Sequence, residues 1–99
     1  MFELRFTEYA EAEFEALKSN LARAGLLKQL RKQLGFLQVN VRHPSLQTHE
    51  YHGIPHPYEK HGKVFEAYAQ NATLGAYRIF WCYGPDKKQI TIIAITPHP

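Results

Sequence analysis

The spacing of apolar residues divides the chain into a helical part followed by a β-rich part. From Ala10 to Val41 apolar residues recur at steps of three and four, the spacing of one helix face. From residue 63 onwards the apolar segments are short and are separated by turn-forming residues, as in strands. A chain of 99 residues can bury one two-layer core. The order favours a single α+β domain over residues 1–99, with two N-terminal helices on one face of a mostly antiparallel sheet of four to five strands.

Two apolar stripes locate the helices. Residues 2–6 alternate apolar and charged side chains, as expected for a strand with one buried face. Thr7 then offers a hydroxyl that can cap the first helix. The second helix is expected to begin after a break near Asn20 or Gly25 and to end at Pro44. The predicted buried faces are Ala10, Phe14, Leu17 and Leu21 in the first helix, and Leu27, Leu30, Leu34, Leu37 and Val41 in the second.

Four segments after Pro44 are predicted to be strands. The connections between them contain Gly, Pro and Asn, which favour turns. The expected strands are residues 47–51, 63–70, 76–83 and 89–95, connected by a loop at 53–62, a hairpin loop at 71–75 and a β-turn at 84–87.

The single cysteine and the absence of long apolar runs exclude several classes of protein. Cys82 alone cannot form a disulfide framework or a Cys-based zinc site, and we assign it no catalytic role. No apolar run approaches the roughly 20 residues needed to span a bilayer, so no membrane association is expected. The first residues predict a strand rather than a secretion signal.

Charge is distributed unevenly along the chain. Residues 1–17 carry five glutamates and one arginine, whereas residues 18–99 carry eleven lysines and arginines and four acidic residues. A basic region of this kind suits a polyanion such as RNA or DNA, although a solvated surface of mixed charge would have the same composition. Five of the six histidines also fall between residues 43 and 61. We predict no metal site among them, because His49 and His52 on one strand would point to opposite faces.

Arg78 interrupts an otherwise apolar predicted strand. Because side chains alternate between faces, the bulky odd-numbered residues from Tyr77 to Tyr83 are expected beneath the helices and Arg78 on the opposite, open face. Two interpretations stay open, a salt bridge to Glu66 across the hairpin or a guanidinium that binds phosphate. On an open face Arg78 would add little to the core, and its removal is then predicted to leave the fold intact.

Five segments, taken in order, resemble a known family. They are FTE at residues 6–8, HPSL at 43–46, HEYHG at 49–53, YRIFW at 77–81 and the ending at 92–98. Over nearly its whole length the chain resembles the RelE/ParE superfamily of bacterial type II toxins. The resemblance implies a cytoplasmic toxin without a cofactor, inhibited by an antitoxin protein. It also implies one of two activities, ribosome-dependent mRNA cleavage as in RelE-like members or non-enzymatic poisoning of DNA gyrase as in ParE-like members.

For mRNA cleavage, the resemblance implies attack of a ribose 2′-hydroxyl on its neighbouring phosphate. This reaction needs a group that takes the 2′ proton, a cation at the phosphate and an acid for the leaving oxygen. Arg78 matches the family's phosphate-binding arginine, and His98 matches a C-terminal histidine that acts as acid or base. Glu66 stands where many relatives have basic residues, and it is a candidate general base. Pro99 replaces a tyrosine that follows the histidine in several members.

The remaining cations are assigned to RNA binding. Lys60, His61 and Lys63 are expected to approach Arg78 from the loop, and the other histidines of this region to line an RNA-facing surface. Arg31, Lys32 and Arg42 are expected at the rim, where they would meet ribosomal RNA.

An apolar groove on the helices is the expected docking site for the antitoxin. Tyr9, Phe14 and Leu26 are more apolar surface than one small sheet is expected to cover. An added helix or strand from the partner would bury it.

Overall fold

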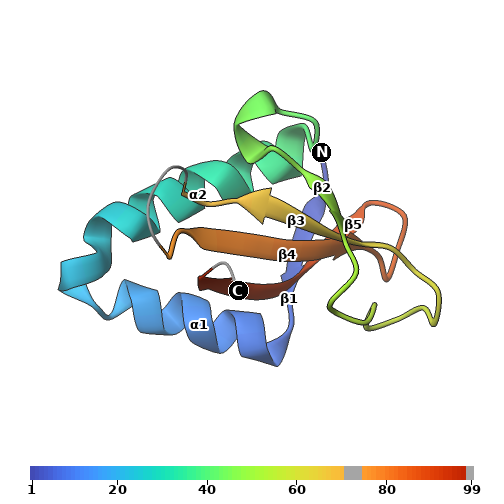
Figure 1. Ribbon diagram of the computed structural model, residues 1–99, viewed down its shortest axis with the longest axis horizontal. Helices are drawn as coiled ribbons and strands as arrows, with labels where there is room; N and C mark the ends of the chain where they lie inside the picture. Colours follow the sequence, from blue (N-terminus) through green and yellow to red (C-terminus); the bar gives the residue numbers. More distant parts are fainter. Residues whose placement is uncertain (71–74, 98–99) are drawn as a thin grey trace.

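Two helices pack against one face of a five-stranded sheet (Figure 1). The computed structural model describes residues 1–70 and 75–97, so the hairpin loop predicted at 71–75 lies mostly outside the described residues. Among the described residues, no helix is long and apolar enough to cross a membrane. The helices are α1 (Glu8–Lys18) and α2 (Ala24–Val39), with 3-10 turns η1 (Leu21–Arg23) and η2 (Pro44–Leu46), and the strands are β1 (Glu3–Phe6), β2 (His49–Tyr51), β3 (Val64–Tyr68), β4 (Tyr77–Tyr83) and β5 (Gln89–Pro97).

The sheet is mixed, with strand order β1-β5-β4-β3-β2. The pairs β2–β3, β3–β4 and β4–β5 are antiparallel, whereas β1 runs parallel to β5. Parallel pairing requires a long crossover connection, and here the helices and the other strands separate β1 from β5. The predicted α+β class, with both helices on one face, is confirmed.

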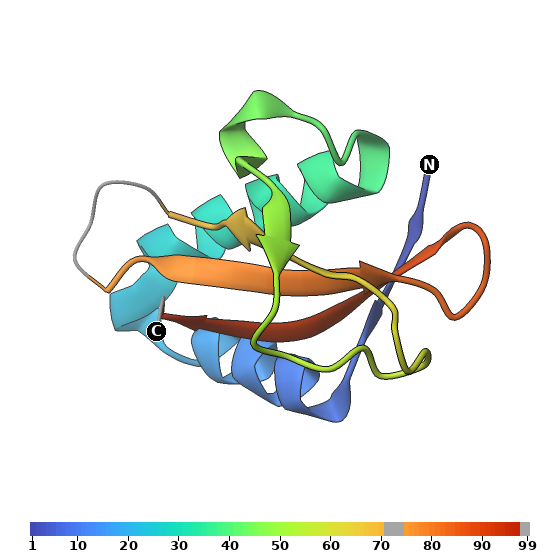
Figure 2. The ribbon, with the colours of Figure 1, turned by 45° about the vertical axis from the view of Figure 1, so that its right-hand side comes forward.

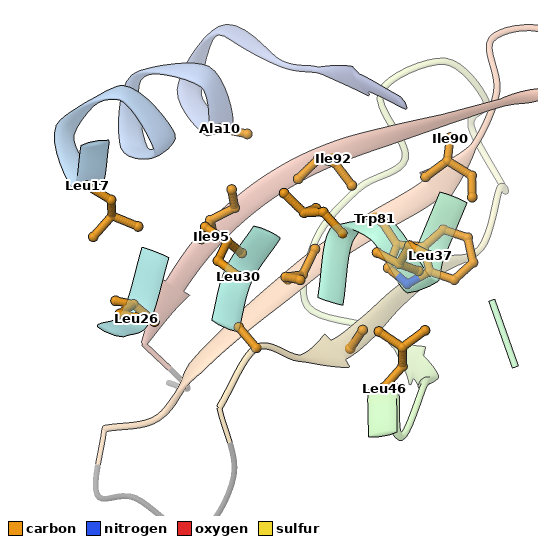
Figure 3. Packing of buried hydrophobic residues seen from close by; sticks show 14 residues of the cluster. Ala10, Leu17, Leu26, Leu30, Leu37, Leu46, Trp81, Ile90, Ile92 and Ile95 are labelled. Atoms are coloured by element: carbon orange, nitrogen blue, oxygen red, sulfur yellow. The ribbon is translucent and has the colours of Figure 1, made fainter. Parts of the chain in front are cut away.

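One apolar core lies between the helices and the sheet (Figure 3). Leu21 is 91% exposed, so its predicted place in the core is wrong. The turn η1 interrupts the helical rotation after α1, and the four-residue step from Leu17 therefore does not keep Leu21 on the buried face. Leu26 is buried instead, one turn before Leu30 on α2. The buried core residues of both layers include Ala10, Leu17, Leu26, Leu30, Leu34, Leu37, Ile79, Trp81, Ile90, Ile92 and Ile95.

Two polar side chains begin the helical segments. The Thr7 hydroxyl accepts a hydrogen bond from the Ala10 backbone N–H at 3.1 Å, which confirms the predicted cap of α1. Asn20 does the same for η1, accepting from the Ala22 N–H at 3.1 Å. Of the two predicted break positions, Asn20 is the correct one, because Gly25 lies inside α2.

The helix α2 ends at Val39, before the proline that was expected to end it. Asn40 has extended backbone angles, and its N–H donates to the Phe36 carbonyl at 2.7 Å. Pro44 instead begins η2, where its missing N–H is not needed.

The helix α1 covers the edge of β5 that β1 leaves open. β1 pairs with β5 only as far as Ile92, and the β4–β5 register is irregular at the next residue, Ile93. The Thr7 hydroxyl donates to the Ile93 carbonyl at 2.8 Å, and Glu13 accepts from the Ile95 N–H at 2.8 Å. Burial raises the pKa of the Glu13 carboxyl, and the bond from Ile95 opposes that rise. The side chains of Thr7, which caps α1, and of Glu13 within it thus replace the hydrogen bonds of a missing strand.

Removing the Glu13 acceptor should therefore loosen the contact between α1 and β5. Glu13→Ala leaves the Ile95 N–H without a partner, and we expect it to lower the free energy of unfolding by about 1–3 kcal/mol. Glu13→Gln keeps an acceptor oxygen and should lose clearly less. Urea unfolding of both variants measures the difference, and equal losses would show that the hydrogen bond is not the cause.

The segment between β2 and β3 crosses the face of the sheet opposite the helices (Figure 2). His56 organises it: Nδ1 accepts from the N–H groups of Tyr58 and Glu59 at 3.0 and 3.1 Å, and Nε2 donates to the Tyr83 carbonyl at 3.1 Å. Gly62 lies against the imidazole, where a Cβ would stand 2.4 Å from a ring carbon. This loop therefore covers the half of the face near Tyr83.

Candidate functional site

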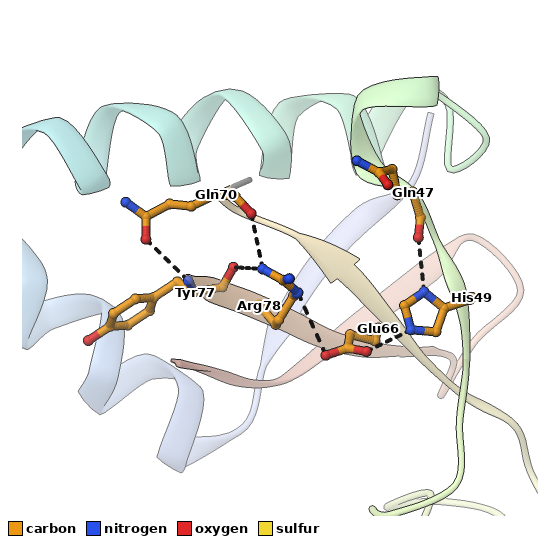
Figure 4. A network of polar contacts seen from close by, with 6 residues as sticks. All are labelled: Gln47, His49, Glu66, Gln70, Tyr77 and Arg78. Atoms are coloured by element: carbon orange, nitrogen blue, oxygen red, sulfur yellow. Dashed lines mark hydrogen bonds and ion pairs between the residues drawn. The ribbon is translucent and has the colours of Figure 1, made fainter. Parts of the chain in front are cut away.

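Three neighbouring strands bring His49, Glu66 and Arg78 to the sheet face opposite the helices. His49 of β2 lies directly across from Glu66 of β3. Arg78 of β4 lies across from Tyr68, two residues beyond Glu66 on the same face. The predicted placement of Arg78 on this face is therefore correct, and Figure 4 shows the three side chains meeting there.

Glu66 is buried between the two basic side chains. It is 1% exposed, and its Oε1 lies 2.7 Å from His49 Nε2. Its second oxygen lies 3.9 Å from Arg78 Nε. The His49 side chain is 51% exposed, so a ligand approaching this face would meet the imidazole before the carboxylate.

Both ring nitrogens of His49 face oxygen atoms. Nδ1 lies 3.0 Å from the Gln47 carbonyl oxygen, which can only accept, and Nε2 faces Glu66. A neutral imidazole carries one N–H and cannot donate to both oxygens. The geometry thus presents a half-exposed imidazole that is held between a backbone carbonyl and a buried carboxylate.

Arg78 is buried, whereas the sequence predicted it on an open surface. It is 8% exposed, and Nη1 donates to the carbonyl oxygens of Gln70 at 3.0 Å and Tyr77 at 3.3 Å. The guanidinium carbon also lies 3.7 Å from the centre of the Tyr68 ring. The salt bridge to Glu66, one of the two interpretations, is present. The expectation that Arg78 contributes little to packing is therefore wrong.

The predicted loop cations do not converge on Arg78. Lys63 precedes β3 at the end of the sheet near Tyr83, and Lys60 and His61 belong to the loop that His56 attaches to that same end. All three are exposed. Arg78 lies near the opposite end of β4, because strand β3 runs antiparallel to it.

The other predicted site residues lie apart from the sheet face. Arg31 and Lys32 are exposed on α2, and Arg42 is exposed just after it. His98 lies outside the described residues, so its role stays a prediction.

Cys82 is buried on the face that the loop covers. Its burial and the nearby Glu59 carboxylate raise the pKa of the thiol to about 11. The thiol is therefore protonated near neutral pH and is a poor nucleophile.

The histidines of this region have separate surroundings. His43 stacks on Phe36 with ring centres 3.7 Å apart, while His56 holds the loop. His52 lies 3.7 Å from a Glu50 oxygen. Within residues 1–70 and 75–97, no three His, Cys, Asp or Glu side chains are grouped to hold a metal ion.

Solved structures with this architecture include YoeB and RelE proteins. No family profile matches the sequence, and no curated protein is significantly similar to it. The YoeB dimer of Staphylococcus aureus is 12% identical, with a TM-score of 0.70 over 99% of this chain and 98% of that chain. The chain has the fold of the RelE and YoeB toxins. A YoeB/ParE toxin from Agrobacterium tumefaciens is 10% identical, with a TM-score of 0.68 over 99% and 100% of the two chains. A chain of the intact Escherichia coli RelBE toxin–antitoxin complex is 16% identical, with a TM-score of 0.64 over 100% of this chain and 99% of that chain.

The resemblance to the RelE/ParE superfamily is thus confirmed at the level of fold. The sequence patterns placed His49 on an RNA-facing surface. They did not indicate that His49 pairs with Glu66. The available signal was Glu66, an acid within an apolar strand, because a buried carboxylate requires a partner.

Proposed function

We propose that this chain is the toxin of a type II toxin–antitoxin pair and acts in the cytoplasm. Its fold supports this proposal, since solved proteins of the same architecture are toxins and one forms a RelBE toxin–antitoxin complex. The partner would be an antitoxin protein. Leu26 is buried and Phe14 stacks on Phe6 at 5.8 Å, so of the three residues expected in the docking groove only Tyr9 is largely exposed.

The activity that the site supports best is ribosome-dependent cleavage of mRNA. One observation carries this proposal: an exposed imidazole, His49, is supported by a buried carboxylate that also faces an arginine. Cleavage by a 2′-hydroxyl needs a proton carrier and a cation close together. The His49–Glu66 pair would carry the proton, and Arg78 would stabilise the phosphate charge.

In this mechanism each described residue has a limited role. His49 would exchange a proton with the RNA at the 2′-oxygen or the 5′-oxygen. Glu66 positions and polarises the imidazole rather than touching RNA, because it is buried. His98 would be the second proton carrier. Arg31, Lys32, Arg42, Lys60, His61 and Lys63 would bind the phosphates of mRNA and ribosomal RNA.

The second candidate is ParE-like inhibition of DNA gyrase without catalysis. The burial of Arg78 favours it, because a guanidinium already bonded to two carbonyl oxygens is less available to phosphate.

Induced expression in bacteria distinguishes the two activities. We expect cut transcripts and arrested translation, with DNA replication continuing at first, and rescue by co-expression of an antitoxin if a gene for one lies beside this gene. Primer extension on a reporter mRNA, with and without translation of that mRNA, measures cleavage and its dependence on the ribosome. Intact transcripts together with an induced DNA-damage response would contradict the endonuclease and support gyrase inhibition.

A further inference from the structure

A polar groove opens between α2, η2 and the end of β3, beside the His49–Glu66–Arg78 network. Its volume is about 260 Å³. We call it the amide groove, because four of its lining residues are Gln29, Gln33, Gln47 and Gln70; Lys32 and Tyr68 also line it.

The groove exists because β2 is shorter than β3. β2 pairs with β3 only as far as Glu66, which leaves the last part of the β3 edge without a neighbouring strand. Gln33 closes this edge: its amide nitrogen donates to the Tyr68 carbonyl at 2.7 Å and to the Ser45 carbonyl at 3.0 Å. The Ser45 hydroxyl donates back to the Gln33 oxygen at 3.1 Å. The side-chain amide of Gln33 therefore already uses its nitrogen and its oxygen within the protein.

Gln29, Lys32 and Gln47 also line the groove and are exposed to solvent. Among the described residues, the side-chain amides of Gln29 and Gln47 make no hydrogen bond, and no carboxylate lies within ion-pair distance of Lys32. Each amide presents one donor group and one acceptor. A flat ligand with alternating donors and acceptors, next to a negative charge, matches this set.

Gln47 is held in an unfavourable backbone conformation. Its φ is 47°, and it is the one non-glycine with positive φ among the described residues. A glycine would adopt this angle readily, whereas a residue with a Cβ does so at a cost. The backbone conformation alone would therefore favour glycine over glutamine at this position. Its carbonyl accepts from His49, and its side chain lines the groove.

From this geometry we propose that the amide groove binds one nucleobase of the RNA next to the cleaved phosphate. The proposal rests on the proposed RNA cleavage and adds a base-recognition site to it. The volume of the groove is smaller than the roughly 300 Å³ of the smallest usual ligand pockets. A volume of this size suits a single base. The backbone carbonyls of Gln47 and Gln70 contact His49 and Arg78, so a base bound here places its own phosphate toward both.

Nucleoside 5′-monophosphates test the groove without any cleavage. We titrate each of the four into ¹⁵N-labelled protein and follow side-chain and backbone amides by NMR, with inorganic phosphate in parallel. We expect saturable shifts of the Gln29 and Gln47 side-chain amides with at least one nucleotide, and smaller shifts there with phosphate. Equal shifts with phosphate, or shifts confined to the surface around Arg31 and Arg42, would overturn the proposal.

Gln47→Gly separates binding from folding. It removes one recognition amide and relieves the positive φ, so the melting temperature should stay the same or rise. Nucleotide affinity should fall roughly three- to tenfold, the usual effect of losing one hydrogen bond. Gln38→Ala, which removes a glutamine of α2 outside the groove, should leave affinity unchanged. Unchanged affinity in Gln47→Gly would overturn the proposal.

The outcomes also separate this proposal from RNA cleavage itself. Nucleotide binding in the groove by a protein that leaves RNA intact would end the endonuclease proposal and keep the binding site. If the protein cleaves RNA but no nucleotide shifts the groove amides, the endonuclease proposal is kept and the base-binding proposal is wrong.

Discussion

His49→Gln is expected to slow cleavage of ribosome-bound mRNA by roughly 10²–10⁴-fold, the usual loss on removing a general acid or base. Glutamine can still donate a hydrogen bond to Glu66, and the exposed position makes unfolding of the variant unexpected. It cannot, however, exchange a proton near neutral pH as an imidazole does. Single-turnover cleavage on stalled ribosomes measures the chemical step apart from binding.

His52→Gln is the matched control for His49→Gln. His52 directly follows β2, its side chain is 83% exposed, and its Nδ1 lies 3.7 Å from a Glu50 oxygen. Its replacement should leave the cleavage rate within about twofold of the wild-type rate, because surface substitutions away from a site have small effects. Equal rates for wild type and His49→Gln would remove His49 from the mechanism and leave His98 as the candidate proton carrier.

Arg78→Ala is expected to destabilise the fold by about 3 kcal/mol or more, because it removes one partner of a buried ion pair. The variant also loses the bonds to the Gln70 and Tyr77 carbonyls and the contact with the Tyr68 ring. For a domain of this size, such a loss corresponds to a melting temperature lower by roughly 10–25 °C. Thermal unfolding followed by circular dichroism measures it.

Two further variants show whether loss of the ion pair with Glu66 causes the destabilisation of Arg78→Ala. Arg42→Ala, an exposed arginine without a carboxylate partner among the described residues, should melt close to wild type. Arg78→Met combined with Glu66→Gln removes both charges and should recover much of the stability, because no uncompensated charge stays buried. If Arg78→Ala alone unfolds at the wild-type temperature, the buried guanidinium does not hold the fold.

Local patterns in the sequence were sufficient to predict most of the elements. The hydroxyl of Thr7 marks the start of α1, and the steps of three and four locate the buried faces of both helices. Alternation along β4 places Arg78 opposite the helices, since a strand has only two faces. These features depend on residues within one or two turns or a single strand, and a chain therefore encodes them locally.

Only the tertiary structure decided which of these segments meet. His49 and Glu66 are separated by a loop of twelve residues, and no local signal sets the register that places them opposite each other. The same holds for β1 beside β5, and for Glu13 at the open edge of β5. The burial of Arg78 follows from Tyr68, Gln70 and Glu66 surrounding it together. Pairing between distant strands depends on how the whole core packs, and so the site could be assembled only from the folded chain.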